Sequence, residues 1–195
     1  MRGAGFYEHG PADVVQVIDD LPVPEPGPGE VRIAIKAAAL NRLDLWVRDG
    51  WPGLELHMPH ITGSDGAGVI DTLGAGVSGY TVGDRVCIDP TIVPADSPAL
   101  MTGMESQSHI AILGEHVSGT AVEYRCIPAR NLLRLPDGVT FEAAAAAGLV
   151  YVTAWHSLIT RGGLRAGPDR RGGWWREYGE YSDRQTSRCA CHRRG

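Results

Sequence analysis

The residues of this chain whose types could do chemistry lie in and just before a glycine-rich stretch, residues 62–86. Ser64 and Asp65 follow Gly63 inside it, and Asn41 and Asp44 precede it. A catalytic zinc ion needs about three protein ligands and an open position. Asp65 could supply one oxygen, but a lone carboxylate does not make a zinc site. We therefore expect no metal ion here.

The histidines and cysteines do not change this expectation. No histidine lies at ligand spacing with a cysteine or aspartate, so we expect four of them to be surface or loop residues: His57, His60, His109 and His116. The four cysteines are too few and too scattered for a disulfide framework. Two of them form Cys189-Ala-Cys191-His192, which could be a metal-binding fragment or an accident of the tail described below.

The elements that must position these residues are mostly strands. Residues 22–30 form a proline-rich connector that is neither helix nor central strand. Val31, Ile33 and Ile35 alternate with polar or small residues, which predicts a half-buried strand. Asn41 with Asp44 three residues later is typical of a pair that caps a short helix.

The glycines of residues 62–86 predict the turning corners of a small β-barrel. Val69-Ile70 and Val82 with Val86 indicate short strands between them. The motif Gly66-Ala67-Gly68 precedes a strand-like run instead of a helix, so it is not a phosphate-binding loop.

The sequence pattern changes after residue 89. Residues 90–108 form a long irregular loop and residues 117–127 return to a β-like pattern. Thr140 is a good N-cap for a helix that follows, and residues 151–159 predict a second, more apolar helix that ends at Gly162-Gly163.

Composition limits the function classes. The net charge is −5 and charges of one sign do not form long runs, so we expect no nucleic-acid partner. No apolar stretch approaches the length of roughly 20 residues that a membrane helix needs, and the start lacks the apolar core of a signal peptide. We expect a cytoplasmic protein.

Several ordered motifs then identify a family. They are His9-Gly10-Pro11 and the segments 22–31, 37–50, 59–86, 113–124 and 135–167. Over residues 1–167 the chain resembles the medium-chain dehydrogenase/reductase superfamily, in particular its quinone-oxidoreductase and alcohol-dehydrogenase-like members. The resemblance implies a mainly β fold: a GroES-like β-barrel (1–135), the first helices of an incomplete α/β Rossmann domain (136–167), and a disordered tail outside the family pattern (168–195).

The resemblance also bears on zinc. Zinc-dependent members have cysteine where Asn41 stands, Gly-His-Glu where Gly63-Ser64-Asp65 stands, and a further cysteine or aspartate near Leu149. Members with structural zinc have four cysteines in the loop that here reads Thr91 to Ser108. This chain lacks both sets, so the resemblance implies zinc-independent chemistry.

Without metal, the family reaction is direct hydride transfer from NAD(P)H to a quinone or enone. The resemblance implies that Asn41 lies beside the nicotinamide and that Thr153 contacts it, with Tyr151 a candidate for the cleft wall. Asn41 and Asp44 are the candidate catalytic residues. Each of these residues also has a purely structural alternative. Asn41 and Asp44 could serve only as a helix cap, and Tyr151 could be a core residue. Thr153 could bond its own helix backbone.

The residues after Gly167 do not fit the family. A strand, a glycine-rich turn and a helix that hold the pyrophosphate are expected there, but the sequence has almost no aliphatic residues. Trp174-Trp175 read one base forward must encode glycine, and the same frame permits T-V-V-G-A-G-G-V-N-T-A. Our hypothesis is that residues from about 168 are a frameshifted reading of the lost motif.

Three functions remain open at this point. The chain could derive from a zinc-independent, NAD(P)H-dependent oxidoreductase acting on a small carbonyl or quinone substrate. It could be a non-catalytic GroES-like product, able to form a homodimer but unable to bind cofactor. A zinc-dependent alcohol dehydrogenase is the third alternative.

Overall fold

The fold of the chain is mainly β. The computed structural model describes residues 1–93 and 111–165, and the chain divides into two compact units, Met1–Thr153 and Ala154–Gly195. The predicted tail and the Cys189–His192 cluster lie outside the described residues, as does His109. The strands are β1 (Gly3–Phe6), β2 (Gln16–Ile18), β3 (Glu30–Ala39), β4 (His60–Ile61), β5 (Asp65–Leu73), β6 (Arg85–Ile88), β7 (Thr91–Ile92), β8 (Ala111–Ile112), β9 (Tyr124–Pro128) and β10 (Leu132–Arg134).

The described part of the chain has fewer helices than strands. The helices are the short 3₁₀ turns η1 (Ala12–Val14) and η3 (Ala129–Asn131), the α-helices α1 (Arg42–Asp49) and α3 (Phe141–Trp155), and the π-helix η4 (His156–Arg161). The helix predicted after Thr140 is confirmed, and the Thr140 hydroxyl accepts a hydrogen bond from the Ala143 amide at 3.1 Å.

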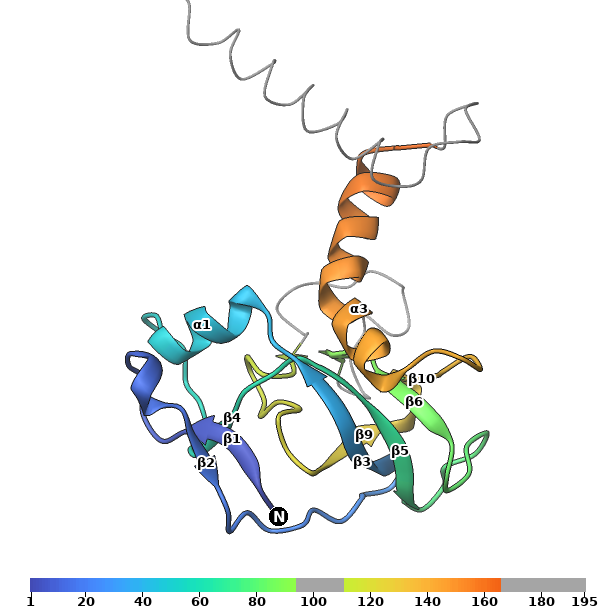
Figure 1. Ribbon diagram of the computed structural model, residues 1–195, viewed down its shortest axis with the longest axis horizontal. Coiled ribbons are helices and arrows are strands. Elements are labelled where there is room, and N and C mark those ends of the chain that lie inside the picture. The colour runs from blue at the N-terminus through green and yellow to red at the C-terminus, as the bar shows by residue number, and fades with distance from the viewer. Residues whose placement is uncertain (94–110, 166–195) are drawn as a thin grey trace, which may run out of the picture. The chain divides into compact units, whose positions relative to one another are not determined.

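All named strand pairs of the described chain are antiparallel. Five strands lie side by side in the order β10-β6-β5-β3-β9 (Figure 1), and a second sheet has the order β2-β1-β4. The predicted strand of alternating residues is β3, which pairs with β5 on one side and β9 on the other. Val31 and Ile33 are completely buried, and burial of such a side chain contributes about 1.5–3 kcal/mol.

The hydrophobic core of the unit Met1–Thr153 lies between its strands. Its largest cluster consists of aliphatic side chains from five strands and one loop: Val31, Ile33, Ile70, Val86, Ile88, Leu113, Ile127 and Leu132. These positions follow the period of two that places every second side chain on one face. The core therefore fixes the register of β5, the strand that begins at Asp65.

The glycine-rich stretch has two different roles. Gly76, Gly79 and Gly83 have positive φ angles, as corners require. The prediction is wrong for Gly66 and Gly68, which lie inside β5. A Cβ atom on Gly68 would lie 2.2 Å from the Ala34 carbonyl oxygen, so close packing of β5 on β3 requires glycine there. The strand assignment of Val82 is also wrong, because it is an exposed turn residue.

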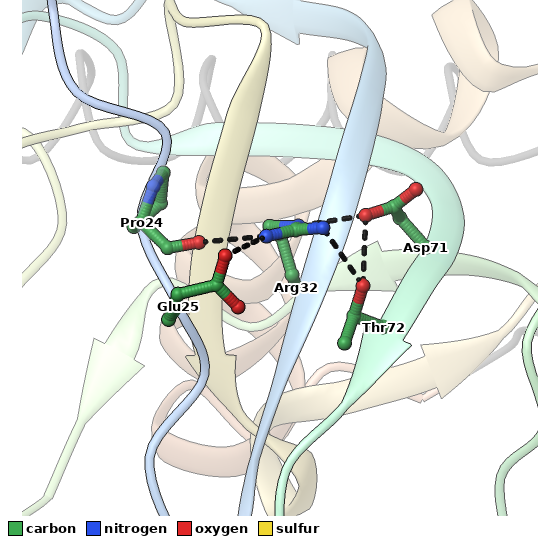
Figure 2. A network of polar contacts seen from close by, with 5 residues as sticks. All are labelled: Pro24, Glu25, Arg32, Asp71 and Thr72. Carbon is green, nitrogen blue, oxygen red and sulfur yellow. Dashed lines mark hydrogen bonds and ion pairs between the residues drawn. The ribbon is translucent and has the colours of Figure 1, made fainter.

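Arg32 joins the proline-rich connector to the sheet (Figure 2). Its guanidinium donates to Asp71 Oδ2 at 2.6 Å and to Thr72 Oγ1 at 2.9 Å, both on β5. It also reaches the connector through the Pro24 carbonyl and the Glu25 carboxylate. The Arg32 hydrogen bond holds the pKa of Asp71 below its usual value. One β3 side chain thus fastens a segment that has no regular structure of its own.

The expectation about apolar length is wrong for one segment. Phe141–Arg161 forms 21 helical residues that are long and apolar enough to cross a membrane by length and composition. The two helices predicted from the sequence run together, with one non-helical residue, Gly148, inside α3. This is weak evidence for a membrane segment, since the core helix of a globular protein meets the same criterion.

Candidate functional site

Asn41 and Asp44 stand at the start of α1, where the extended β3 strand gives way to helix. Asn41 is the N-cap residue, and its backbone amide donates to Asp44 Oδ2 at 2.6 Å. The other oxygen of Asp44 accepts a hydrogen bond from the Gly63 amide at 2.7 Å. The predicted capping pair is confirmed. Asp44, only 6% exposed, additionally links α1 to the turn before β5.

Asp65 is the second buried carboxylate of the site. It is 2% exposed, and its Oδ2 accepts a hydrogen bond from Asn41 Nδ2 at 3.0 Å. Its Oδ1 accepts one from the Leu149 amide of α3 at 2.8 Å. Burial raises the pKa of Asp65, while these two hydrogen bonds oppose the shift and the charge of Asp44 adds to it.

Gly148 lies against the same carboxylate. Its φ and ψ angles, −54° and −105°, are not helical, so α3 is broken there. A Cβ atom on Gly148 would lie 2.1 Å from Asp65 Oδ1. Sequence reasoning missed this contact. The available signal was a glycine inside an apolar helical run, which often has a packing reason.

A pocket of about 630 Å³ opens beside Asp65. Its lining includes Cys87, Asn131 and three residues of α3: Ala144, Ala145 and Gly148. Burial raises the pKa of the Cys87 thiol, which favours the unreactive protonated form at neutral pH. The lining thus combines an apolar wall from α3 with polar and charged side chains from the strands and loops opposite it.

The side chains at the positions named for catalytic zinc do not fit that ion. Zinc is bound by cysteine sulfur, histidine nitrogen or carboxylate oxygen. Asn41, Ser64 and Leu149 offer none of these, and both oxygens of Asp65 already accept hydrogen bonds. Within residues 1–93 and 111–165 there is no group of three or more His, Cys, Asp or Glu placed to hold a metal ion.

The remaining predicted residues lie apart from this network. Tyr151 is 61% exposed on α3, and Thr153 is exposed as well. The core alternative for Tyr151 is therefore wrong. The structure brings Asn41 and Asp44 together with Asp65, and leaves Tyr151 and Thr153 facing solvent within the described chain.

His60 corrects the expectation for the histidines. It lies on β4 at 1% exposure, with its ring 5.4 Å from that of Phe6 and its Nε2 3.2 Å from the Gly114 carbonyl oxygen. Burial lowers its pKa, and the Gly114 hydrogen bond opposes that shift. His57 and His116 are exposed, as expected.

Comparison with known proteins decides the family. Residues 27–137 match the alcohol dehydrogenase GroES-like domain. The chain belongs to this family. Its fold and its relatives place it in the medium-chain dehydrogenase/reductase superfamily, whose members are oxidoreductases. The family and the mainly β fold inferred from sequence are thereby confirmed.

Individual relatives agree with this assignment. A solved structure of an NAD-dependent alcohol dehydrogenase is 43% identical, with a TM-score of 0.80, and the match covers 86% of this chain and 49% of that one. Human quinone oxidoreductase is 29% identical over 167 residues, which are 86% of this chain and 43% of the relative. A zinc-type alcohol dehydrogenase-like protein of Schizosaccharomyces pombe is 36% identical over 132 residues, 68% of this chain and 37% of the relative. The chain thus spans less than half the length of these relatives.

Proposed function

We propose that this GroES-like chain belongs to a zinc-independent, NAD(P)H-dependent oxidoreductase that transfers hydride directly to a quinone, enone or aldehyde. The likeness to quinone oxidoreductase supports the reaction class. The observation that carries the proposal is the hydrogen bond from Asn41 to Asp65. The resemblance aligns Asn41 and the segment that holds Asp65 with the metal-ligand motifs of zinc-dependent members, and an amide–carboxylate pair there supports chemistry without a Lewis acid.

In this proposal, Asn41 and Asp44 are the catalytic-site residues, and Asn41, Tyr151 and Thr153 contact the cofactor. The nicotinamide supplies the hydride. The chain's own part is to orient it and to exclude water. Asn41 suits this role because its side chain is held by Asp65 and its backbone amide by Asp44. Tyr151 and Thr153 suit it because they are exposed on α3.

We propose further that this chain alone binds little or no NAD(P)H. The residues after Gly167 have a composition unlike a strand, glycine-rich turn and helix, and a pyrophosphate needs the amides of such a turn. The test is a fluorescence titration of the purified chain with NADH and NADPH. We expect no saturable change, and micromolar binding would contradict this part of the proposal.

The frameshift hypothesis concerns residues outside the described chain and has its own test. Sequencing the gene beyond codon 167 should find a Rossmann-like open frame shifted by one base. A repaired chain made from that frame should bind NAD(P)H and reduce a quinone. If no such frame exists, the hypothesis is wrong.

Metal analysis separates the proposal from the zinc-dependent alternative. The purified chain, loaded with zinc and then passed over a desalting column, should retain well below one zinc ion per molecule. A zinc-dependent alcohol dehydrogenase treated in the same way is the control. Stoichiometric zinc that protects the chain against heat would overturn the zinc-independent assignment.

A non-catalytic role for this chain is the second candidate, because the apolar side chains Val150, Tyr151 and Val152 are more than half exposed. Exposed apolar patches favour association, and a cytoplasmic homodimer is the form that we propose. Light scattering after gel filtration should show a dimer, and a monomer at all concentrations would contradict this.

A further inference from the structure

The break in α3 has a specific partner. Regular helices leave their first amide groups without an acceptor, and a break inside a helix creates a new start. After the break at Gly148, the amide of Leu149 donates to Asp65 Oδ1 at 2.8 Å. Asp65 thus stands toward residues 149–153 as an N-cap residue stands toward a helix, although it lies on β5, far away in sequence.

Two further contacts make this arrangement specific. The second oxygen of Asp65 accepts from Asn41 Nδ2 at 3.0 Å, which fixes the orientation of the carboxylate. The absence of a side chain on Gly148 provides the space, because a Cβ atom there would lie 2.1 Å from Oδ1. Asp65 is also 2% exposed, so water does not compete freely for these bonds.

We infer that Asp65 is a positioning residue, which caps the second half of α3 from β5 and so sets where Tyr151 and Thr153 stand relative to Asn41. The functional meaning rests on the proposed function, in which those residues contact the cofactor. The capping itself does not depend on it. Asp65 joins the start of α1 and the break of α3 through its two oxygens, one to each helix.

The first test measures amide hydrogen exchange at Leu149 by NMR in the cofactor-free chain. In Asp65→Ala, exchange at Leu149 should be about ten- to a hundred-fold faster, because a charge-assisted hydrogen bond is lost. Asp65→Asn should restore most of the protection, since its amide oxygen can accept from Leu149 while the Asn41 amide turns to pair with its NH₂ group. Asp71→Asn, on the same strand, is the matched control and should leave Leu149 unchanged.

The second test is a double-mutant cycle with Gly148. Alanine normally favours a helix over glycine, but Gly148→Ala should lower the melting temperature here because its Cβ meets the carboxylate. Combined with Asp65→Ala, the same substitution should cost less or become favourable, so the two effects should not add. If Asp65→Ala is too unstable to study, Asp65→Ser can take its place in the double-mutant cycle, which measures melting temperatures and needs no NMR.

Either of two results would overturn the inference: unchanged exchange at Leu149 in Asp65→Ala, or an equal effect of Gly148→Ala in both backgrounds. Neither measurement needs cofactor, zinc or substrate. A failure of the proposed function, such as stoichiometric zinc binding, would therefore be seen separately from a failure of the cap.

Discussion

The strand β5 carries two aspartates in opposite environments, Asp65 at its start and Asp71 near its end. Asp65 is 2% exposed and is bonded by neutral amides, and burial raises its pKa. The Asp71 side chain is 35% exposed and lies 2.6 Å from the Arg32 guanidinium, which lowers its pKa. The pKa values of these two aspartates thus shift in opposite directions because their neighbours differ.

The difference teaches what each end of β5 does. At the Asp71 end, an ion pair joins β5 to Arg32 on β3, which also contacts the proline-rich connector. Water can replace such a partly exposed pair at little cost. At the Asp65 end, a buried carboxylate joins two helices by accepting hydrogen bonds from the Asn41 side-chain amide and the Leu149 backbone amide. Moving a carboxylate out of water costs free energy, and well-placed hydrogen bonds must offset that cost. The Asp65 end is therefore the part of β5 where function is expected.

Removal of each carboxylate should show this contrast most strongly. We expect Asp65→Ala to lower the free energy of unfolding by about 2–4 kcal/mol, since it leaves the amides of Asn41 and Leu149 without acceptors. Asp71→Ala should cost less than about 1 kcal/mol, because the ion pair that it removes is partly open to solvent. Urea unfolding monitored by circular dichroism measures both. Equal costs would break the comparison.

Asp44 extends the buried network, and its partial loss should be intermediate. Asp44→Asn keeps one carbonyl oxygen for two amide donors, those of Asn41 and Gly63. We expect a loss of about 1–2 kcal/mol in the free energy of unfolding, the range for one buried hydrogen bond left unmade. Asp84 supplies the control, because it accepts a hydrogen bond from the Thr81 amide but is less buried than Asp44. Asp84→Asn should cost clearly less.

The pH dependence of stability should have opposite signs at the two ends. Because the folded pKa of Asp65 is raised, its contribution to stability falls as pH rises from the ordinary carboxyl value, 3.8, through the folded value. The contribution of Asp71, whose folded pKa is lowered, is complete above 3.8 and is lost as pH falls through the folded value.

Urea unfolding at about pH 3, below the ordinary carboxyl value, and at about pH 7 tests these signs. Relative to the wild type, Asp65→Asn should gain stability at the higher pH, whereas Asp71→Asn should lose stability there. If both variants shift in the same direction, the two carboxylates do not differ in the way proposed.

The local features of this fold could be predicted from sequence, and the long-range ones could not. The alternation of Val31 and Ile33 and the pairing of Asn41 with Asp44 are set by residues within a few positions of each other. The bond from Leu149 to Asp65 joins residues 84 positions apart, and no local pattern marks it. Only the resemblance to a family placed the two near one site.

The errors have the same origin. Gly68 is a residue type that is common in turns, but it lies in β5. The Ala34 carbonyl approaches it too closely for any side chain. His60 looks like a loop residue, yet it is buried against Phe6. In both cases the decisive neighbour comes from a strand that is distant in sequence, so only the folded chain reveals why the residue is there.

Salt provides the smallest and last test of the comparison. High ionic strength screens exposed charges but acts weakly on buried polar contacts. In about 1 M NaCl, the cost of Asp71→Asn should shrink by a few tenths of a kcal/mol, because the Arg32 ion pair is weakened in the wild type. The cost of Asp65→Ala should stay the same, since its partners are neutral amides within a buried network. Thermal unfolding of the three proteins at low and high salt measures both effects. A salt-dependent cost at Asp65 would mean that this carboxylate is held by charge, and the contrast along β5 would then be one of degree.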